Sequence, residues 1–475
     1  MIANLIGGEW SRPETESLPV YNPATEEVIE SVPLSGSHEV NLAVAAASEA
    51  LKQWSRTSVM ERATLMFRYK QLLEAHVDEL ATVVTRHHGK TLEEARGEVR
   101  RGIEVVDFAC GAPSLLQGRT LRQVSADVDQ DLYRYPVGVV AGIPPFNFPV
   151  MIPLWMFPLA VVAGNTFVLK PSERTPLGAV HLAQLFNDAG FPPGVLNVVH
   201  GAQEAVKALV SSPDVHAISF VGSAPVARWI YEEAARHGKR VQALGGAKNH
   251  IVVMPDAELD VAVPAILGSA FGNAGERCLA GSVLVTVGQA AQNVMESLEK
   301  KTRALRVGPG DEPGVDVGPL IRRDHRDRVA AHIDRGLADG ARLIVDGRDE
   351  TARRGFFLGP TLLDGVTPEM SVGTDEIFGP VLSISHVDNL DKAIAQANRM
   401  SLGNMAVIFT ASGRAARTFR ENVEAGMVGV NVPVAQPFAF FPFSGWKGSF
   451  YGDLHVHGTD GIDFYTRKKV FITRW

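Results

Sequence analysis

The sequence predicts an α/β protein built around a doubly wound parallel sheet, and the alternation of segments along the chain supports this prediction. From Tyr133 onward, short apolar runs with β-strand character alternate with helical segments of about ten to fifteen residues. The chain shows no internal repeat and no low-complexity linker. Its 475 residues are enough for two or three domains, each with a substantial core.

The first part of the chain is rich in helices. Between residues 39 and 111, Leu, Val and Met recur at helical spacing among Glu, Arg and Ala. The most apolar segment, residues 149–164, is too short to span a bilayer and carries Pro153 and Pro158. We therefore expect it to form a buried helix.

Two series of buried strands follow, and the boundary between them is expected near Gly245 and Gly246. Strands of the first series are expected at residues 138–143, 166–169, 196–199, 217–221 and 240–244. Strands of the second series, between about residues 247 and 429, are expected at residues 251–253, 282–287, 381–386 and 406–409.

Composition excludes several classes of function. Hydrophobic residues make up 45% and charged residues 21%, as in globular proteins, and the net charge is −7. Without a long basic run we expect no binding of nucleic acid, and we expect no membrane segment. Two cysteines cannot form a disulfide framework, and the N-terminus lacks the pattern of a signal peptide. These features favour the cytoplasm.

One of the two cysteines lies in a small polar loop. Cys278 follows Glu276 and Arg277, after the glycines at 272 and 275 have ended a helical segment. A neighbouring guanidinium favours the thiolate, which is the reactive form of cysteine. Cys110, in contrast, follows an apolar helix face and is expected to pack in a core.

Two other segments have an unusual combination of residues. Residues 142–149 follow a predicted strand, and their prolines form a rigid platform that can aim the side-chain amide of Asn147. Residues 375–381 place a carboxylate and an aromatic ring directly before Gly379 and Pro380. With Cys278, these segments point to a site.

At this point the chain resembles the aldehyde dehydrogenase superfamily. The matching motifs occur in order and cover most of the chain: PFNFP at 145–149, KPSE at 170–173, FVGS at 220–223, LGG at 244–246, GERC at 275–278, EIFGP at 376–380 and PFSGWK at 442–447. The resemblance implies a doubly wound NAD-binding domain (residues 1–120 and 137–245), an α/β catalytic domain (246–440) and a β oligomerisation arm (121–136 and 460–475).

The arm has an alternative interpretation. Residues 127–135 and 461–475 are polar, alternating segments that have the pattern of strands with one solvated face. They would also fit a surface hairpin. The resemblance implies instead that they pair with another subunit in a homodimer or homotetramer.

The usual glycine-rich dinucleotide fingerprint is missing from this chain. Gly222 and Ser223 replace it, because they precede a helix whose N-terminus can bind a pyrophosphate. Ala227 stands where many members of the family have Gly. By resemblance, Lys170 and Glu173 contact the adenosine ribose. Glu173 would repel a 2′-phosphate, which favours NAD over NADP, although Arg174 could tolerate that phosphate.

The remaining cofactor contacts are also implied by the resemblance. Pro144 and Phe146 flank the cofactor, and Gly245 lies near the nicotinamide. Glu376 binds the nicotinamide ribose, and Phe378 lies against the nicotinamide ring.

In the chemistry that the resemblance implies, the Cys278 thiolate adds to an aldehyde. Asn147 and the backbone N–H of Cys278 donate to the oxyanion, and hydride loss leaves a thioester. Relatives that hydrolyse this thioester have a glutamate at the position of Ala243, and alanine cannot activate water. We therefore expect coenzyme A to accept the acyl group. The alternative is hydrolysis that uses Glu276 or free hydroxide.

Within the family, the chain is most similar to the CoA-acylating branch that oxidises malonate semialdehyde or methylmalonate semialdehyde. By resemblance, Arg277 and Arg101 bind the substrate carboxylate, which is then lost as carbon dioxide. Arg101 could also be a solvated helix residue, and Arg100 beside it is a competing candidate. A hypothesis from another class is a non-catalytic protein with this fold, and the intact set Cys278, Asn147, Lys170 and Glu376 argues against it.

Overall fold

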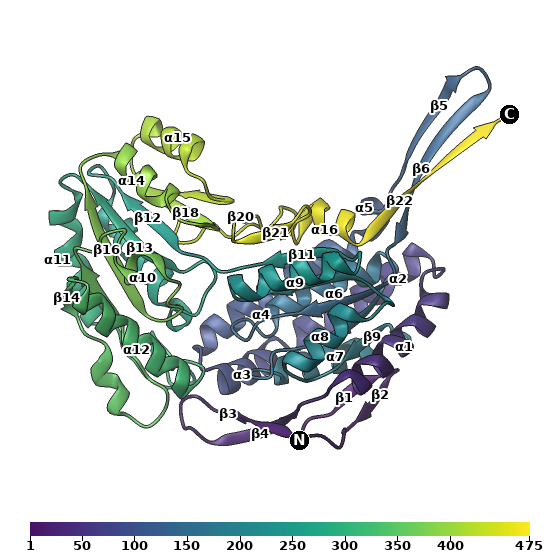
Figure 1. The fold of residues 1–475 in the computed structure, drawn as a ribbon, viewed down its shortest axis with the longest axis horizontal. Coiled ribbons are helices and arrows are strands. Elements are labelled where there is room, and N and C mark those ends of the chain that lie inside the picture. Colours follow the sequence, from purple (N-terminus) through teal and green to yellow (C-terminus); the bar gives the residue numbers. More distant parts are fainter.

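The computed structural model describes all 475 residues and contains two large sheets flanked by helices, with a thin β arm that projects from the body (Figure 1). The chain begins with two hairpins that the sequence analysis did not anticipate. They pair β1 (Asn4–Ile6) with β2 (Glu9–Ser11), and β3 (Ser17–Tyr21) with β4 (Val28–Pro33). No helix combines the length and the apolarity needed to cross a bilayer.

The helix-rich part expected at residues 39–111 is confirmed. It consists of α1 (Ser37–Trp54), α2 (Val59–Ala75), α3 (Val77–His88), α4 (Leu92–Cys110) and the short α5 (Ala112–Leu115). Cys110 is buried among apolar side chains, as predicted. The apolar segment also forms the expected buried helix, α6 (Met151–Val162), in which every side chain is buried.

The first large sheet has eight strands in the order β2-β1-β9-β8-β7-β10-β11-β21. Its inner strands pair in parallel and match the predicted series: β7 (Val139–Ile143), β8 (Thr166–Leu169), β9 (Leu196–Val198), β10 (Val215–Val221) and β11 (Arg240–Leu244). From β7 the chain builds outward first through β8 and β9, and then on the other side through β10 and β11. Ligands bind at such a reversal of strand order, outside the carboxyl ends of the strands.

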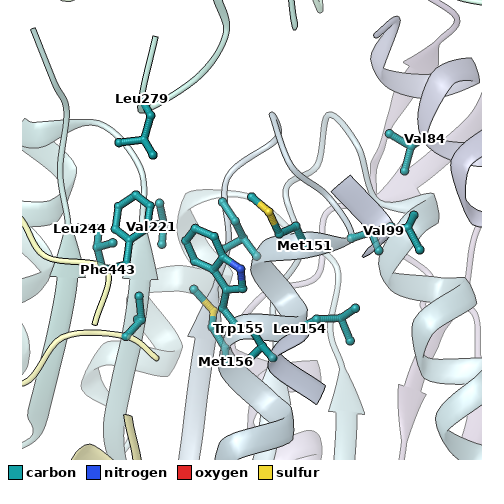
Figure 2. Close-up of a cluster of buried hydrophobic side chains, with 14 of the residues drawn as sticks. Val84, Val99, Met151, Leu154, Trp155, Met156, Val221, Leu244, Leu279 and Phe443 are labelled. Atoms are coloured by element: carbon teal, nitrogen blue, oxygen red, sulfur yellow. The ribbon is translucent and has the colours of Figure 1, made fainter. Parts of the chain in front are cut away.

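Helices cover both faces of this sheet because alternate strand residues point to opposite faces. Val139 and Ala141 of β7 pack with α1, α8 (Gln203–Ser211) and α9 (Ala224–Arg236), whereas Val140 faces the core formed with α2, α3, α4, α6 and α7 (Leu177–Asp188). In Figure 2 the Trp155 indole of α6 lies among Met151, Met156 and Phe443, and its ring centroid is 5.0 Å from that of Phe443.

The second large sheet has seven strands in the order β14-β15-β16-β13-β12-β18-β19. They are β12 (Asn249–Val253), β13 (Gly281–Val287), β14 (Arg342–Val345), β15 (Thr361–Asp364), β16 (Val381–Val387), β18 (Met405–Phe409) and β19 (Met427–Val430). The flanking helices are α10 (Leu259–Phe271), α11 (Ala290–Arg303), α12 (Arg323–Ala338), α13 (Ser371–Thr374), α14 (Leu390–Asn398) and α15 (Gly413–Asn422).

The chain passes from the first sheet to the second between Leu244 and Asn249, which is where the sequence placed the boundary. One later segment returns to the first sheet, since β21 (Phe450–Gly452) pairs antiparallel with β11. A small two-stranded sheet of β17 (Leu402–Gly403) and β20 (Trp446–Lys447) lies beside it. The division into domains with the limits given above stays a prediction.

The projecting arm is a three-stranded sheet in the order β22-β6-β5, formed by β5 (Arg119–Ser125), β6 (Val128–Pro136) and β22 (Thr466–Arg474) (Figure 1). The prediction of a strand from residue 461 was wrong at its start, because α16 (Gly458–Phe464) covers residues 461–464. This segment is helical because Gly461, Ile462 and Tyr465 are buried at helical spacing, and a Cβ on Gly461 would lie 2.9 Å from Leu159.

Candidate active site

The site is a cavity of about 1180 Å³ at the carboxyl ends of the parallel strands of the first sheet. It faces the second sheet, which contributes Cys278, Glu376 and Phe378 to its lining. All the residues expected to contact the cofactor line it, together with the expected nucleophile and oxyanion donor: Pro144, Phe146, Asn147, Lys170, Glu173, Arg174, Gly222, Ser223, Gly245, Cys278, Glu376 and Phe378.

Asn147 is held in place at the end of the loop that follows β7. Its side chain is buried, and its Nδ2 donates a hydrogen bond to the backbone carbonyl of Glu276 at 2.8 Å. An amide nitrogen carries two hydrogens, so one donor remains for another partner. Next to it, Phe146 stacks on His88 with ring centroids 6.1 Å apart, and the Arg174 guanidinium lies 5.4 Å from the centre of the Phe146 ring.

Lys170 and Glu173 follow β8 at the same edge of the sheet. Lys170 Nζ donates to the carbonyl of Gly201 at 2.6 Å and lies 3.4 Å from Glu173 Oε2. Burial alone would raise the pKa of Glu173, but the charges of Lys170 and Arg174 bring that pKa below its ordinary value. Glu173 is therefore a carboxylate at neutral pH.

The turn at Gly222 and Ser223 precedes α9. Ser223 occupies the N-cap position, but its side chain makes no capping hydrogen bond. The first N–H groups of α9 are therefore free to donate to a ligand. A Cβ at Gly222 would lie 2.4 Å from the Phe220 ring, which explains the glycine. Ala227 lies within α9 and is fully buried. Such a helix N-terminus is suited to a phosphate group.

Glu376 and Phe378 come from the segment that precedes β16. Glu376 Oε1 accepts a hydrogen bond from the Ala247 N–H at 2.9 Å, and burial raises the pKa of Glu376 to about 6. Gly246 allows this approach, because a Cβ there would lie 2.4 Å from Glu376 Oε2. Phe378 has a φ of 58°, a left-handed conformation that is strained for an aromatic residue.

Cys278 lies between α10 and β13, directly after the 3₁₀ turn Gly272–Gly275. Asn273 and Ala274 in this turn have φ values of 55° and 51°, and the Cys278 carbonyl accepts hydrogen bonds from Asn249 and Asn404, each at 2.9 Å. The sequence argument for a thiolate was wrong for this state of the protein. Burial raises the pKa of Cys278 to about 11, and the charge of Arg277 lowers it only in part.

Arg101 and Arg277 do not line the large cavity. They line a second cavity of about 220 Å³, which we call the arginine cavity. A narrow cavity of about 10 Å³ contains both Cys278 and Arg277 in its lining, and shares Phe148 and Met151 with the arginine cavity. Cys278 thus lines both the large cavity and the narrow cavity that Arg277 also lines.

Arg101 is a residue of α4 that lines the arginine cavity but not the narrow one. Its guanidinium is 2.8 Å from Glu104 Oε2 and 4.9 Å from the centre of the Phe438 ring. Arg100, the competing candidate, is exposed and lines none of these cavities. The structure thereby favours Arg101 over its neighbour.

The carboxyl group of Glu276 is turned away from the large cavity, which argues against its expected alternative role in activating water. It is fully buried, and Oε1 accepts from the Ile321 N–H at 3.2 Å and lies 3.3 Å from His325 Nε2. Burial raises the pKa of Glu276 to about 8, so the group is mainly neutral at pH 7. Ala243 is also fully buried, in β11, and does not line the cavity.

Sequence reasoning missed several residues of the large cavity. Asp324, His325 and Arg328 line it from the start of α12, and Lys207 and Trp229 line it from α8 and α9. No sequence signal marked them, because charged residues on amphipathic helices are ordinary surface residues unless the fold turns them toward a site.

Comparisons with known proteins agree with this geometry. The model of the aldehyde dehydrogenase family matches residues 10–471. A malonate-semialdehyde dehydrogenase of Halalkalibacterium halodurans is 53% identical over 478 residues, covering 100% of this chain and 98% of the relative. The solved structure of a methylmalonate-semialdehyde dehydrogenase from Oceanimonas doudoroffii has a TM-score of 0.98 at 48% identity, over 100% of this chain and 98% of that one. A Sinorhizobium meliloti relative solved with NAD has a TM-score of 0.98 at 43% identity, with the same coverage.

Proposed function

The chain belongs to the aldehyde dehydrogenase family, and from this premise we propose that it oxidises malonate semialdehyde or methylmalonate semialdehyde with NAD and transfers the acyl group to coenzyme A. The position of Cys278 carries the proposal. This thiol lines the cavity that contains the nucleotide-binding residue types, and it also lines a narrow cavity together with Arg277, which in turn lines the arginine cavity with Arg101.

The large cavity fits a dinucleotide. Its volume of about 1180 Å³ exceeds that of a typical small-ligand pocket, and the uncapped N-terminus of α9 offers N–H donors to a pyrophosphate. Lys170 and Glu173 would bind the adenosine ribose, and Glu376 the nicotinamide ribose. When bound, NAD would supply the acceptor for the hydride that leaves the aldehyde carbon. The carboxylate of Glu173 favours NAD over NADP.

Cys278 would act as the nucleophile. Once its thiol is deprotonated, Sγ forms a bond to the aldehyde carbon, and the carbonyl oxygen becomes an oxyanion. The free hydrogen of Asn147 Nδ2 and the N–H of Cys278 would donate to that oxyanion, while the Glu276 carbonyl holds the other Asn147 hydrogen. After oxidation the acyl group is linked to Cys278 as a thioester.

The thioester would then react with a thiol and not with water. Ala243 has no proton acceptor, and the Glu276 carboxyl lies outside the large cavity. Arg101 and Arg277 would hold the substrate carboxylate, and decarboxylation becomes feasible because the thioester carbonyl stabilises the resulting enolate. The balanced reaction is malonate semialdehyde with NAD⁺ and coenzyme A giving acetyl-CoA, carbon dioxide and NADH. The methylated substrate gives propionyl-CoA.

The test is to measure NADH formation from malonate semialdehyde with and without coenzyme A, and to identify the product. We expect turnover that depends on coenzyme A and yields acetyl-CoA. Equal turnover without coenzyme A, with a free acid as the product, would assign the protein to the hydrolytic class. Absence of NADH under both conditions would favour a non-catalytic role.

We also propose that the arm formed by β5, β6 and β22 pairs with a second copy of the chain, giving a homodimer or homotetramer. The arm projects from the body (Figure 1). Leu121, Val470 and Ile472 on it are exposed apolar side chains. Sedimentation of a Val470→Asp/Ile472→Asp variant tests this. We expect a smaller assembly than that of the parent, and an unchanged assembly would contradict the proposal.

A further inference from the structure

A buried ion pair lies behind the loop that carries Asn147. Lys90 Nζ is 2.6 Å from Glu98 Oε2, and both side chains are completely shielded from solvent. Lys90 precedes α4, and Glu98 lies within that helix. Burying two charges is unfavourable unless each has further hydrogen-bond partners. The other contacts of this pair therefore indicate its purpose.

Lys90 uses its ammonium group to hold the loop. Nζ donates to the backbone carbonyl of Asn147 at 2.7 Å and lies 4.0 Å from the centre of the Phe148 ring. An ammonium group has three donors, and the Glu98 carboxylate, the Asn147 carbonyl and the Phe148 ring account for all three. Lys90 is therefore engaged with the loop and has no donor left for substrate.

Glu98 holds the other end of the same loop. Its Oε1 accepts hydrogen bonds from the N–H groups of Val150 and Met151, at 2.8 and 3.1 Å. These are among the first N–H groups of α6, which would otherwise have no acceptor. Glu98 therefore binds the start of α6 with Oε1 and Lys90 with Oε2, and Lys90 in turn binds the Asn147 carbonyl.

The pair also lies between the arginine cavity, where the substrate carboxylate would bind, and the large cavity, where Asn147 would meet the oxyanion. Lys90 and Glu98 line the arginine cavity together with Arg101 and Arg277, and the loop they hold carries Asn147 on the side of the large cavity. Asn147 has one more anchor, its Nδ2 contact with the Glu276 carbonyl. The backbone of Asn147 is thus held from one side and its side chain from the other.

We propose that the Lys90–Glu98 ion pair is the positioning element that aims the Asn147 amide at the oxyanion. The inference rests on the proposed function, because it assigns Asn147 the oxyanion. Lys90 and Glu98 are positioning residues that act through Asn147. Removing the pair would leave substrate binding largely intact and slow the chemical step.

The test compares the double variant Lys90→Met/Glu98→Gln with the parent. This variant removes both charges together, so it leaves no uncompensated buried charge. We expect a folded protein whose kcat falls by at least about tenfold, while the aldehyde KM changes by less than about threefold. Lys239→Met is a matched control, because Lys239 is another buried lysine that donates to two backbone carbonyls, those of Ser212 and Val215, but lines none of the three cavities.

A mutant cycle with Asn147→Ala separates a positioning role from a merely structural one. If the pair acts through Asn147, the double change should slow an Asn147→Ala enzyme by no more than about twofold further. A folded double variant with the parent's kcat overturns the proposal, and so does a full additional tenfold loss in the Asn147→Ala background. Should the double variant not fold, Lys90→Arg enters the same cycle under the same criteria, because it keeps the charge but changes the shape of the donor.

Failure of the proposed function has a different outcome in these experiments. If Asn147→Ala alone keeps the parent's kcat, Asn147 does not serve the oxyanion. The assignment of its role is then wrong, whatever the ion pair does. If Asn147→Ala is slow and the pair variant is not, only the inference about Lys90 and Glu98 is wrong.

Discussion

The Nδ2 atom of Asn147 donates a hydrogen bond to the backbone carbonyl of Glu276 across 2.8 Å, and this contact joins the two halves of the site. Asn147 follows a strand of the first sheet, whereas Glu276 precedes a strand of the second. The same carbonyl accepts from Asn273 Nδ2, also at 2.8 Å. Cys278 is only two residues further on, and it lines the same cavity as Asn147.

Replacing Cys278 with alanine should abolish aldehyde-dependent NADH formation, with a loss of at least about a thousandfold in kcat. The nucleophile is then absent, and no other cysteine lines the large cavity. Cys110→Ala is the matched control, because Cys110 is buried in the core of the helical layer. Stopped-flow and steady-state assays of NADH measure both variants. Persistent turnover by the Cys278→Ala protein would exclude this nucleophile.

Alkylation of Cys278 should accelerate with pH in protein free of cofactor. Burial raises the pKa of this thiol to about 11, so the thiolate fraction should grow about tenfold per pH unit between pH 7 and pH 9. The measurement is the rate of labelling with iodoacetamide, followed by mass spectrometry, with Cys278→Ala as the blank. A rate that levels off below about pH 8 would show that the thiol is more acidic than the buried environment predicts.

Glu276 should make folding stability depend on pH. Its folded pKa of about 8 lies above the ordinary value of 4.5, so the folded state binds the proton more tightly. The contribution of Glu276 to folding stability is fully present below the ordinary pKa of 4.5, and it is lost as the pH rises through the folded pKa of about 8. Relative to Glu276→Gln, the parent should lose at most about 1.4 kcal/mol of unfolding free energy per pH unit between pH 5 and pH 8.

Urea unfolding at several pH values measures this difference. The glutamine variant is the appropriate reference, because the other titrating groups near the site, such as Glu376, are common to both proteins. Parallel stability curves for the two proteins would mean that Glu276 is ionised in the folded state.

Arg101→Met should raise the KM for malonate semialdehyde by about 10- to 100-fold, because a charged hydrogen bond to the substrate carboxylate is lost. The KM for propanal, which has no carboxylate, should stay unchanged. Arg100→Met provides the control, since that neighbouring side chain is exposed. Equal effects on both aldehydes would show that Arg101 supports the protein and does not bind the carboxylate.

Glu173→Gln should shift the cofactor preference toward NADP, with the ratio of kcat/KM for NADP to that for NAD rising about tenfold. The carboxylate at this position is held ionised by Lys170 and would repel a 2′-phosphate. Glu49→Gln removes an exposed carboxylate on α1 that does not line the cavity, and it should leave the ratio unaltered. If Glu173→Gln also leaves it unaltered, the preference is determined elsewhere in the cavity.

The parallel strands of the first sheet could be predicted because each is buried and appears as a short apolar run, as in β7. In the second sheet the parallel strands β15 and β19 were missed, because each is only four residues long. The short antiparallel strands at the two ends of the first sheet could not be predicted. β1 and β21 are three residues long and are strands only because β9 and β11 present free hydrogen-bonding groups to them. The helix α16 was missed for a related reason, since the burial of Ile462 depends on distant partners.

The sequence by itself determined which chemical groups the protein has: a cysteine in a polar loop, an amide after a strand, and alanine at position 243 in place of a base. Only the tertiary structure decided the protonation state of these groups and the orientation of their side chains. It raised the pKa of Cys278 despite the adjacent Arg277, turned the Glu276 carboxyl away from the cavity, and set Lys90 and Glu98 behind Asn147. The reason is physical: desolvation and hydrogen bonding depend on all the atoms around a group, and the fold brings most of those atoms from remote parts of the chain.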